Sequence, residues 1–183
     1  MRSRARLIVL SALILLVVAG SVLSWALENN VVETTSSKQV EVNYSEGSCQ
    51  QTGVTIVVDF GASTDRDPIL RCATEFAGTG WEVFQATAID VSGTSQYPVG
   101  FACRIENFPT NAEQNCMDTP KYSEGSWGYF VYTEESGWQV SQVGSAARDA
   151  KCGSAEGWLF IGPGEQDAGL LPKPIPETVT CDG

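Results

Sequence analysis

The sequence predicts a small α+β domain in which one short helix lies on a face of an antiparallel or mixed sheet. Three observations lead to this prediction: several short runs rich in β-branched and aromatic residues, a helix-capping motif, and six cysteines among 183 residues. An even number of cysteines behind an export signal predicts three disulfide bonds that cross-link the domain.

Residues 1–26 have the features of an export signal. Three arginines precede a run without charge that extends from Leu7 to Leu27. Small residues at Ser24 and Ala26 fit a signal-peptidase site, which predicts cleavage after Ala26. The run is also long enough to cross a bilayer, so an uncleaved anchor with the arginines inside the cell is the alternative. Both alternatives predict a protein that is secreted or anchored to the outer face of the cell membrane.

The exported part is strongly acidic. Without the three arginines of the signal, eight basic and 22 acidic residues remain among 157, a net charge of −14. Such a surface repels phosphate backbones and anionic lipid, so we expect no nucleic-acid partner and no membrane contact beyond an uncleaved N-terminal segment. The length is enough for one domain with its own core, which we expect to be a monomer.

Composition divides the exported part into three stretches. Residues 27–52 are polar and lack apolar periodicity, which indicates a linker. Residues 53–162 contain the runs expected for the strands and the helix, and form the predicted domain. Residues 163–183 are punctuated by proline and glycine, which indicates an extended tail.

The predicted elements follow one another through the domain. Residues 54–60, VTIVVDF, predict a buried strand, and residues 69–73 predict a shorter second strand. Further strands are predicted at residues 101–108, which end before a proline, and at residues 156–162.

The predicted helix begins at a capping box formed by Thr79 and Glu82. It should extend over residues 80–88, with Trp81, Phe84 and Ala88 on the face toward the sheet.

Residues 123–144, SEGSWGYFVYTEESGWQVSQVG, predict an aromatic hairpin. An even-length loop pairs Thr133 with Trp138, and this register places Trp127, Tyr129 and Trp138 on one face of the hairpin. An odd-length loop would change the pairing. Two interpretations stay open: the aromatic face packs into the core, or it forms the wall of a ligand site.

The cysteines can pair in many ways, and the sequence alone does not choose among them. In the predicted set, one bond ties the two ends of the domain and another closes a short loop. The predicted disulfides are Cys49 with Cys181, Cys72 with Cys152, and Cys103 with Cys116. A zinc site is not expected, because no C-x-x-C pair occurs and the spacings are irregular.

The chain contains no histidine, which removes the usual general base and the commonest metal ligand. A Ser-His-Asp or Cys-His site cannot be built within it, and neither a G-x-S-x-G elbow nor a phosphate-binding loop occurs. Asp59, Asp65 and Asp67 lack the spacing of a calcium-binding EF-hand. The sequence therefore predicts a protein that is not an enzyme and has no metal or cofactor.

Four motifs stand in order within about residues 54–160: R-C-A, C-R-I, a W-x-Y hairpin with W-x-x-S-x-x-G, and a G-S-x-E-G-W ending. In this combination the chain resembles a group of secreted actinobacterial proteins of unknown function. More distantly, the order of strand, short helix and W-x-Y hairpin resembles the transcobalamin-like C-terminal domain. That resemblance implies a β-grasp-like module.

The resemblance to cobalamin carriers also implies a corrinoid-like ligand, because the module forms one wall of their corrinoid site. Only Trp127 and Tyr129 match the W-x-Y motif of that group. Its leucine-rich helix pattern is replaced here by Trp81, Val83 and Phe84, and its Asn-Gly turn by Glu-Glu-Ser-Gly.

The sequence favours an extracytoplasmic, non-enzymatic binding module that presents Trp127, Tyr129 and Trp138 to a small ring-containing ligand such as a corrinoid. The alternative is a cell-envelope protein-interaction or structural module without a small-molecule ligand, which makes contact through an exposed strand edge. Burial of Trp127 and Tyr129 under the helix that carries Trp81 and Phe84 would favour the alternative.

Overall fold

The structure is a computed structural model of the chain. It describes residues 40–121, 123–166, 168–177 and 181. The predicted signal or anchor, residues 1–26, lies outside this part, as does the first half of the predicted linker. Among the described residues, no helix combines the length and the apolar character needed to cross a bilayer.

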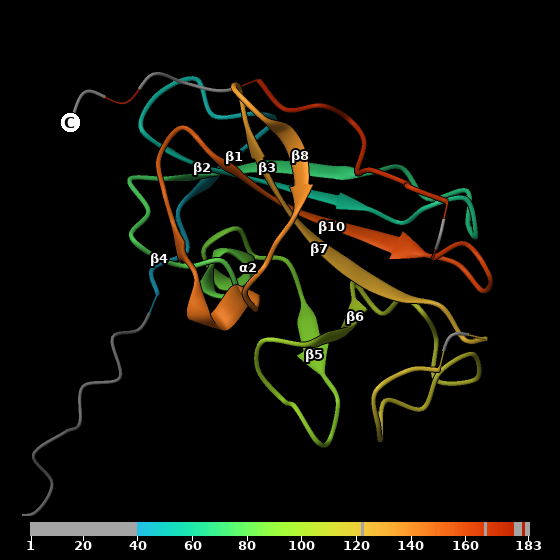
Figure 1. The fold of residues 1–183 in the computed structure, drawn as a ribbon. Coiled ribbons are helices and arrows are strands. Elements are labelled where there is room, and N and C mark those ends of the chain that lie inside the picture. Colours follow the sequence, from blue (N-terminus) through green and yellow to red (C-terminus); the bar gives the residue numbers. More distant parts are fainter. Residues whose placement is uncertain (1–39, 122, 167, 178–180, 182–183) are drawn as a thin grey trace, which may run out of the picture. The chain divides into compact units, whose positions relative to one another are not determined.

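A mixed sheet forms the framework of the domain (Figure 1). Within the described residues it has six strands in the order β1-β3-β2-β10-β7-β8. Their bounds are β1 Tyr44–Glu46, β2 Gly53–Asp59, β3 Ile69–Thr74, β7 Ser126–Thr133, β8 Gly137–Val140 and β10 Ala155–Ile161. Strands β2 and β10 are parallel neighbours at the centre of the sheet, and the other neighbouring pairs are antiparallel.

Shorter elements complete the described fold. They are β4 Gly78–Thr79, α2 Glu82–Ala86, β5 Val91–Gly93, β6 Ala102–Ile105, the 3-10 helix η1 Ser145–Ala147 and β9 Asp149–Ala150. Strand β4 pairs with β9, and β5 pairs with β6, in two small sheets separate from the main one.

The predicted capping box forms at helix α2. The Thr79 backbone N–H donates to Glu82 Oε2 at 2.7 Å, and the Glu82 N–H donates to the Thr79 hydroxyl at 3.3 Å. Val83 and Phe84 are buried against the sheet. The helix is shorter than predicted, because Ala88 takes a left-handed φ of 51° that ends the turn, and its side chain is exposed.

The strands predicted at residues 54–60, 69–73 and 156–162 form as β2, β3 and β10. Of residues 101–108, only β6 is a strand, and it pairs with β5 outside the main sheet. Strand β1 lies within the stretch predicted as a linker. All three of its residues are exposed, so apolar alternation could not reveal it, and it forms by backbone pairing with β3.

Three disulfides cross-link the domain, and one of the predicted bonds, Cys103 with Cys116, is confirmed. The other two predicted pairs are wrong. The observed bonds join Cys49 to Cys72 and Cys152 to Cys181. Cys49 follows β1, and the pairing of β1 with β3 brings it near Cys72, with 4.8 Å between their Cα atoms.

The tail after β10 crosses the upper side of the sheet in Figure 1, on the side away from α2. The Lys173 backbone N–H donates to Asp59 Oδ2 at 2.8 Å, and the Glu177 N–H donates to the Ser48 hydroxyl at 3.0 Å. Pro172 is fully buried. Contacts from β2 and from the loop after β1 therefore hold this extended segment in place.

The sheet buries apolar side chains on both faces. The helix face is the one covered by α2, and its sheet residues include Val54, Ile56, Val58, Trp127, Trp158 and Phe160. The opposite face carries Val57, Phe130, Trp138, Ala155 and Leu159. Because successive side chains point to opposite faces, β7 and β10 contribute residues to two separate cores.

Candidate functional site

The aromatic hairpin of β7 and β8 has an odd-length loop, so the predicted pairing is wrong. Thr133 pairs with Gly137 and Tyr132 pairs with Trp138. Gly137 follows the turn with a φ of 64°, a conformation that glycine adopts without strain. A shift of one residue moves a side chain to the other face of a sheet. The structure therefore brings Trp127 and Tyr129 together but places Trp138 on the opposite face.

Trp138 packs into the core of the opposite face. Its ring lies over Gly157, where an added Cβ atom would come within 2.5 Å of the indole. The Tyr132 and Trp138 rings meet edge to face, with 5.3 Å between their centroids. The absence of a side chain at Gly157 is therefore what allows the indole to close this face.

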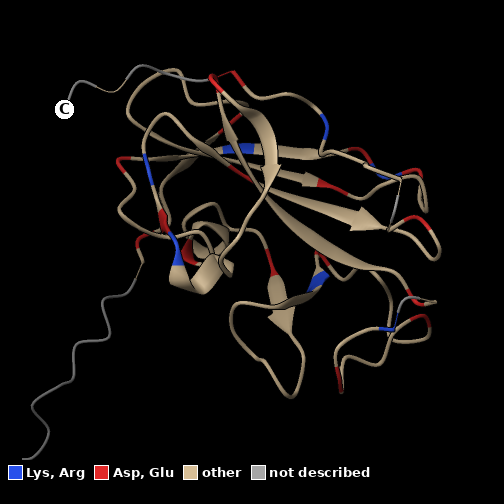
Figure 2. Ribbon diagram, viewed as in Figure 1, with Lys and Arg blue, Asp and Glu red and all other residues tan. Residues whose placement is uncertain are grey.

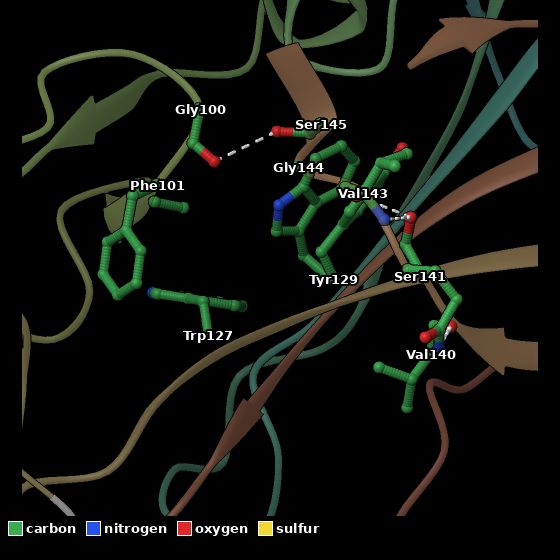
Figure 3. A pocket seen from close by; sticks show the side chains of 12 residues that line it. Gly100, Phe101, Trp127, Tyr129, Val140, Ser141, Val143, Gly144 and Ser145 are labelled. Atoms are coloured by element: carbon green, nitrogen blue, oxygen red, sulfur yellow. Dashed lines mark hydrogen bonds between the residues drawn. The ribbon is translucent and has the colours of Figure 1, made fainter. Parts of the chain in front are cut away.

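Trp127 and Tyr129 line a cavity of about 300 Å³ on the helix face (Figure 3). Together with Trp158 of β10, which is itself only 2% exposed, they form an aromatic floor. Residues 140–145, which follow β8, form one wall, and residues 100–102 form the other. Figure 3 shows Phe101 and Val143 on different sides of this space.

Helix α2 covers only part of the helix face. Phe84 of the helix packs on Trp158, with 4.2 Å between the ring centroids. The part of the helix face above β7 is closed instead by the segments at residues 100–102 and 140–145, and these leave the space between them open.

The floor and the rim of the cavity differ in exposure. Trp127 is 8% exposed and belongs to the core, where its ring meets those of Phe60, Phe108 and Phe160. Tyr129 is half-buried. At the rim, Val140 is 60% and Val143 51% exposed. Trp127 therefore serves mainly as core, and the cavity reaches only part of it.

The residues that line the cavity include no charged side chain. Figure 2 shows that most charged residues lie in loops and turns of the domain. Three polar side chains in the walls of the cavity each donate a hydrogen bond to a backbone carbonyl oxygen. These bonds run from Ser141 to Val143 at 2.7 Å, from Ser145 to Gly100 at 3.4 Å, and from Gln142 to Val140 at 3.3 Å.

A buried polar triad, formed by Tyr129, Arg148 and Glu156, lies beside the cavity. The Tyr129 hydroxyl donates to Glu156 Oε2, and Arg148 Nη1 forms an ion pair with Glu156 Oε1. The Glu156 side chain is fully buried, whereas that of Arg148 is 20% exposed.

Burial dominates the titration of the triad. It raises the pKa of Glu156, against the opposing effects of the Tyr129 hydrogen bond and the Arg148 charge. Burial, and then the negative charge of Glu156, also raise the pKa of Tyr129. The Tyr129 hydroxyl therefore stays protonated and bound to Glu156.

Sequence reasoning found two of the three floor residues and missed Trp158 and the partners of Tyr129. A signal for Glu156 was present, because this acidic residue stands at the head of the apolar run EGWLFI. Acidic side chains are almost never fully buried unless they are paired. No comparable signal marked Arg148, which reaches Glu156 from the loop after η1.

No group of His, Cys, Asp and Glu side chains within the described residues has the arrangement of a metal site. Comparison of the chain with protein-family models, curated proteins and solved structures gives no match. The sequence motifs alone therefore carry the family resemblance described above.

Proposed function

We propose that this protein is a non-enzymatic binding module whose cavity on the helix face takes a small, uncharged, ring-containing ligand. The observation that carries this proposal is the aromatic floor of Trp127, Tyr129 and Trp158 beneath a cavity of about 300 Å³. Small-molecule sites are typically concave and lined by apolar and aromatic side chains with a few polar groups. Aromatic faces supply large contact areas at a low entropic cost.

The volume of the cavity limits the size of the ligand. Small-molecule sites span about 300–1,000 Å³, so this cavity lies at the lower end of the range. A ligand of one or two rings fits such a volume, whereas a corrinoid macrocycle would enter by one edge only. The corrinoid therefore becomes the less favoured member of the proposed class.

We also propose a β-grasp-like fold and an extracytoplasmic location. In support of the fold, the strand order β3-β2-β10-β7, with α2 between β3 and β7 in the chain, agrees with the module that the resemblance implies. In support of the location, three disulfides form, and such bonds persist in oxidising compartments.

A titration of the exported protein tests the binding proposal. Tetrahydropyran, cyclohexanol and methyl glucopyranoside are uncharged single-ring probes that do not absorb where tryptophan does. We expect a saturable change in tryptophan fluorescence with at least one probe up to about 10 mM, which detects complexes as weak as about −4 kcal/mol. Cobalamin absorbs light, so its binding is measured by calorimetry.

A variant that adds a side chain at the cavity lining locates the binding. Gly144 lines the cavity, has no atom within 4 Å of an added Cβ, and has a φ of −63°, so Gly144→Leu adds a side chain without backbone strain. We expect it to weaken binding at least tenfold, whereas Val42→Leu, at an exposed position outside the lining, leaves binding unchanged. The absence of saturation with every probe, or equal binding by both variants, would overturn the proposal.

The free edge of the hairpin favours the second candidate, a protein-interaction module of the cell envelope. Strand β8 is the last strand of the described sheet, and Val140 at its end is 60% exposed. An extended peptide can add to such an edge through main-chain hydrogen bonds. This candidate predicts that Gly144→Leu and the wild type behave alike with every small-molecule probe.

A further inference from the structure

The disulfide between Cys152 and Cys181 fastens the tail that follows β10. We infer that this bond is a site of reversible reduction, at which an external dithiol releases the tail, residues 168–177, from the opposite face of the sheet. Three features carry the inference: the way the tail is held, the exposure of the three disulfides, and the surface that the tail covers. The inference goes beyond the proposed function and does not involve the cavity on the helix face.

The tail is held along β2 by hydrogen bonds at exposed positions. The Lys173 N–H donates to Asp59 Oδ2 at the end of this strand. In the loop between β1 and β2, the Ser48 hydroxyl accepts from the Glu177 N–H, and Gln50 Nε2 donates to Glu177 Oε2 at 3.2 Å. Water competes for such bonds, so they open in local fluctuations that leave the sheet intact.

The Cys152–Cys181 bond is the covalent fastening of the tail. Cys152 lies before β10, and its Sγ accepts a hydrogen bond from the Gly53 N–H, at the start of β2, with 3.4 Å between N and S. The bond therefore ties the tail to the beginning of the two central strands. A tether of this kind keeps the tail at a high effective concentration beside the sheet, so hydrogen bonds that open also re-form.

The three disulfides differ in exposure. Four of the cysteines are at most 7% exposed, and these are Cys49, Cys72, Cys103 and Cys116. Cys152 and Cys181 are both partly exposed. Thiol–disulfide exchange requires a thiolate to reach a disulfide sulfur. A dithiol in solution therefore reduces the Cys152–Cys181 bond ahead of the two buried bonds.

The reduction consumes one dithiol for each bond. A thiolate of the dithiol attacks one sulfur of the bond and forms a mixed disulfide, while the other sulfur leaves as a thiolate and takes up a proton. The second thiol of the dithiol then displaces the cysteine from the mixed disulfide. Two electrons and two protons thus pass from the dithiol, which becomes a cyclic disulfide, to Cys152 and Cys181, which become thiols.

Release of the tail uncovers apolar surface. Pro172 and Pro176 are both buried, so the tail packs against the domain at two points. Val57 is fully buried in the core of the opposite face, and it shares this face with Asp59, which binds the tail two residues further along β2. Figure 1 shows the tail on this side of the sheet. A free tail therefore leaves apolar residues of the opposite face open to solvent, whereas α2 still covers its part of the helix face.

A second disulfide lies close to the released thiols. A Cβ atom added at Gly53 would lie 2.9 Å from Cys49 Sγ and 3.0 Å from Cys72 Sγ, and the N–H of the same glycine is bound to Cys152 Sγ. Exchange between the two bonds would create new pairs. The experiment therefore identifies each pair of cysteines separately.

Selective reduction tests the site itself. The exported protein is treated with about 1 mM dithiothreitol, its free thiols are blocked with iodoacetamide, and the labelled cysteines are identified by mass spectrometry. We expect Cys152 and Cys181 to be labelled at least about tenfold faster than the four buried cysteines. Equal or faster labelling of a buried pair would overturn the inference, and so would a new pair such as Cys49 with Cys181.

Hydrogen exchange, followed by NMR, tests the release of the tail. In the selectively reduced protein we expect the amides of Lys173 and Glu177 to exchange at least about tenfold faster than in the oxidised protein, and those of β2 and β10 to change less than about twofold. The uncharged dye Nile red should gain fluorescence, and reoxidation should reverse both changes. Unchanged tail amides, or faster exchange without a gain of dye fluorescence, would contradict the inference.

Two double variants separate this bond from the loss of any disulfide. Cys152→Ser with Cys181→Ser removes the fastening without a reductant and should reproduce the exchange and dye binding of the reduced protein. Cys103→Ser with Cys116→Ser is the matched control, because it removes a buried bond that joins β6 to the loop before β7. Its tail amides should exchange as in the wild type, and equally fast exchange in both variants would overturn the inference. If a variant does not fold, the comparison of oxidised and reduced wild type still decides.

Discussion

The two faces of the sheet are built by the same strands and are closed in different ways. On the opposite face, Trp138 lies on Gly157 and completes a core with Val57, Phe130 and Leu159. On the helix face, a short helix covers part of the sheet, and this face also contains a cavity and a buried polar triad.

Three consecutive residues of β10 show the difference within one strand. Glu156 and Trp158 point to the helix face, and Gly157 points to the opposite face. On the opposite face the core is apolar, and hydrogen bonds such as the one from the Lys173 N–H to Asp59 Oδ2 hold the tail across it, so the stability of this core depends on shape. The helix face also contains a buried charge, and such a network stabilises only when every member keeps its partner. The comparison predicts that the two faces respond to different kinds of substitution.

The largest effect should come from breaking the triad. Arg148→Met keeps most of the apolar stem but leaves the Glu156 carboxylate buried without its ion-pair partner. We expect the free energy of unfolding, measured with urea, to fall by about 3 kcal/mol, the lower end of the range for a broken buried pair, because Arg148 is partly exposed.

The matched control for this prediction is the second ion pair, in which Arg71 Nε lies 3.0 Å from Glu46 Oε1 and the Glu46 side chain is 70% exposed. Glu46→Gln should change the free energy of unfolding by less than about 1 kcal/mol. Equal losses of unfolding free energy in Arg148→Met and Glu46→Gln would show that the triad stabilises the helix face no more than an exposed ion pair does.

A smaller effect is expected from a change of shape on the opposite face. Gly157→Ala places a Cβ atom within 2.5 Å of the Trp138 ring, so the indole must shift. Overpacking of this kind lowers the free energy of unfolding by about 1–3 kcal/mol. Combining it with Trp138→Leu in a double-mutant cycle should recover part of that loss, because the two residues are in contact.

Gly144→Ala is the control for the glycine substitution, because its added Cβ meets no atom within 4 Å. It should stay within about 0.5 kcal/mol of the wild type. A similarly small effect of Gly157→Ala would mean that the opposite face is packed more loosely than the structure describes.

The contact between Trp138 and Gly157 explains why the site could be predicted only in part. The central strands β2 and β10 follow from continuous apolar runs, and the start of α2 follows from its capping box, because these signals are local. The hairpin register is not local: even and odd loops both fit its sequence, and Trp138 reaches its position over Gly157 on a strand far along the chain. A register that differs by one residue from the predicted one places Trp138, one of the three predicted site residues, on the other face.

Two of the three disulfides and the triad escaped prediction for the same physical reason. Cys49 meets Cys72 through the pairing of β1 with β3, and β1 carries no apolar pattern to reveal it. The burial of Glu156 could be suspected from its place in an apolar strand. Its partner Arg148 depends on where the loop after η1 is placed, which no short motif encodes.

The smallest effect concerns pH, and it separates the helix face, with its buried carboxyl group, from the apolar core of the opposite face. Burial raises the pKa of Glu156 in the folded protein above its value in the unfolded chain, and Arg148 and Tyr129 oppose this shift. The folded state therefore binds the proton more tightly. The resulting stability is fully present below the unfolded pKa of about 4.5 and is lost as the pH rises through the folded pKa.

Urea unfolding of the wild type and of Glu156→Gln, measured between about pH 4 and pH 8, isolates this contribution, because the other carboxylates are shared and their pH dependence cancels in the difference. We expect the stability of the wild type relative to the variant to fall as the pH rises. Gly157→Ala should show no such trend relative to the wild type, since it changes shape and not charge. The opposite result, a relative stability that grows with pH, would mean that Arg148 and Tyr129 lower the pKa of Glu156 by more than burial raises it. The ionised form of Glu156 would then be the one that stabilises the helix face.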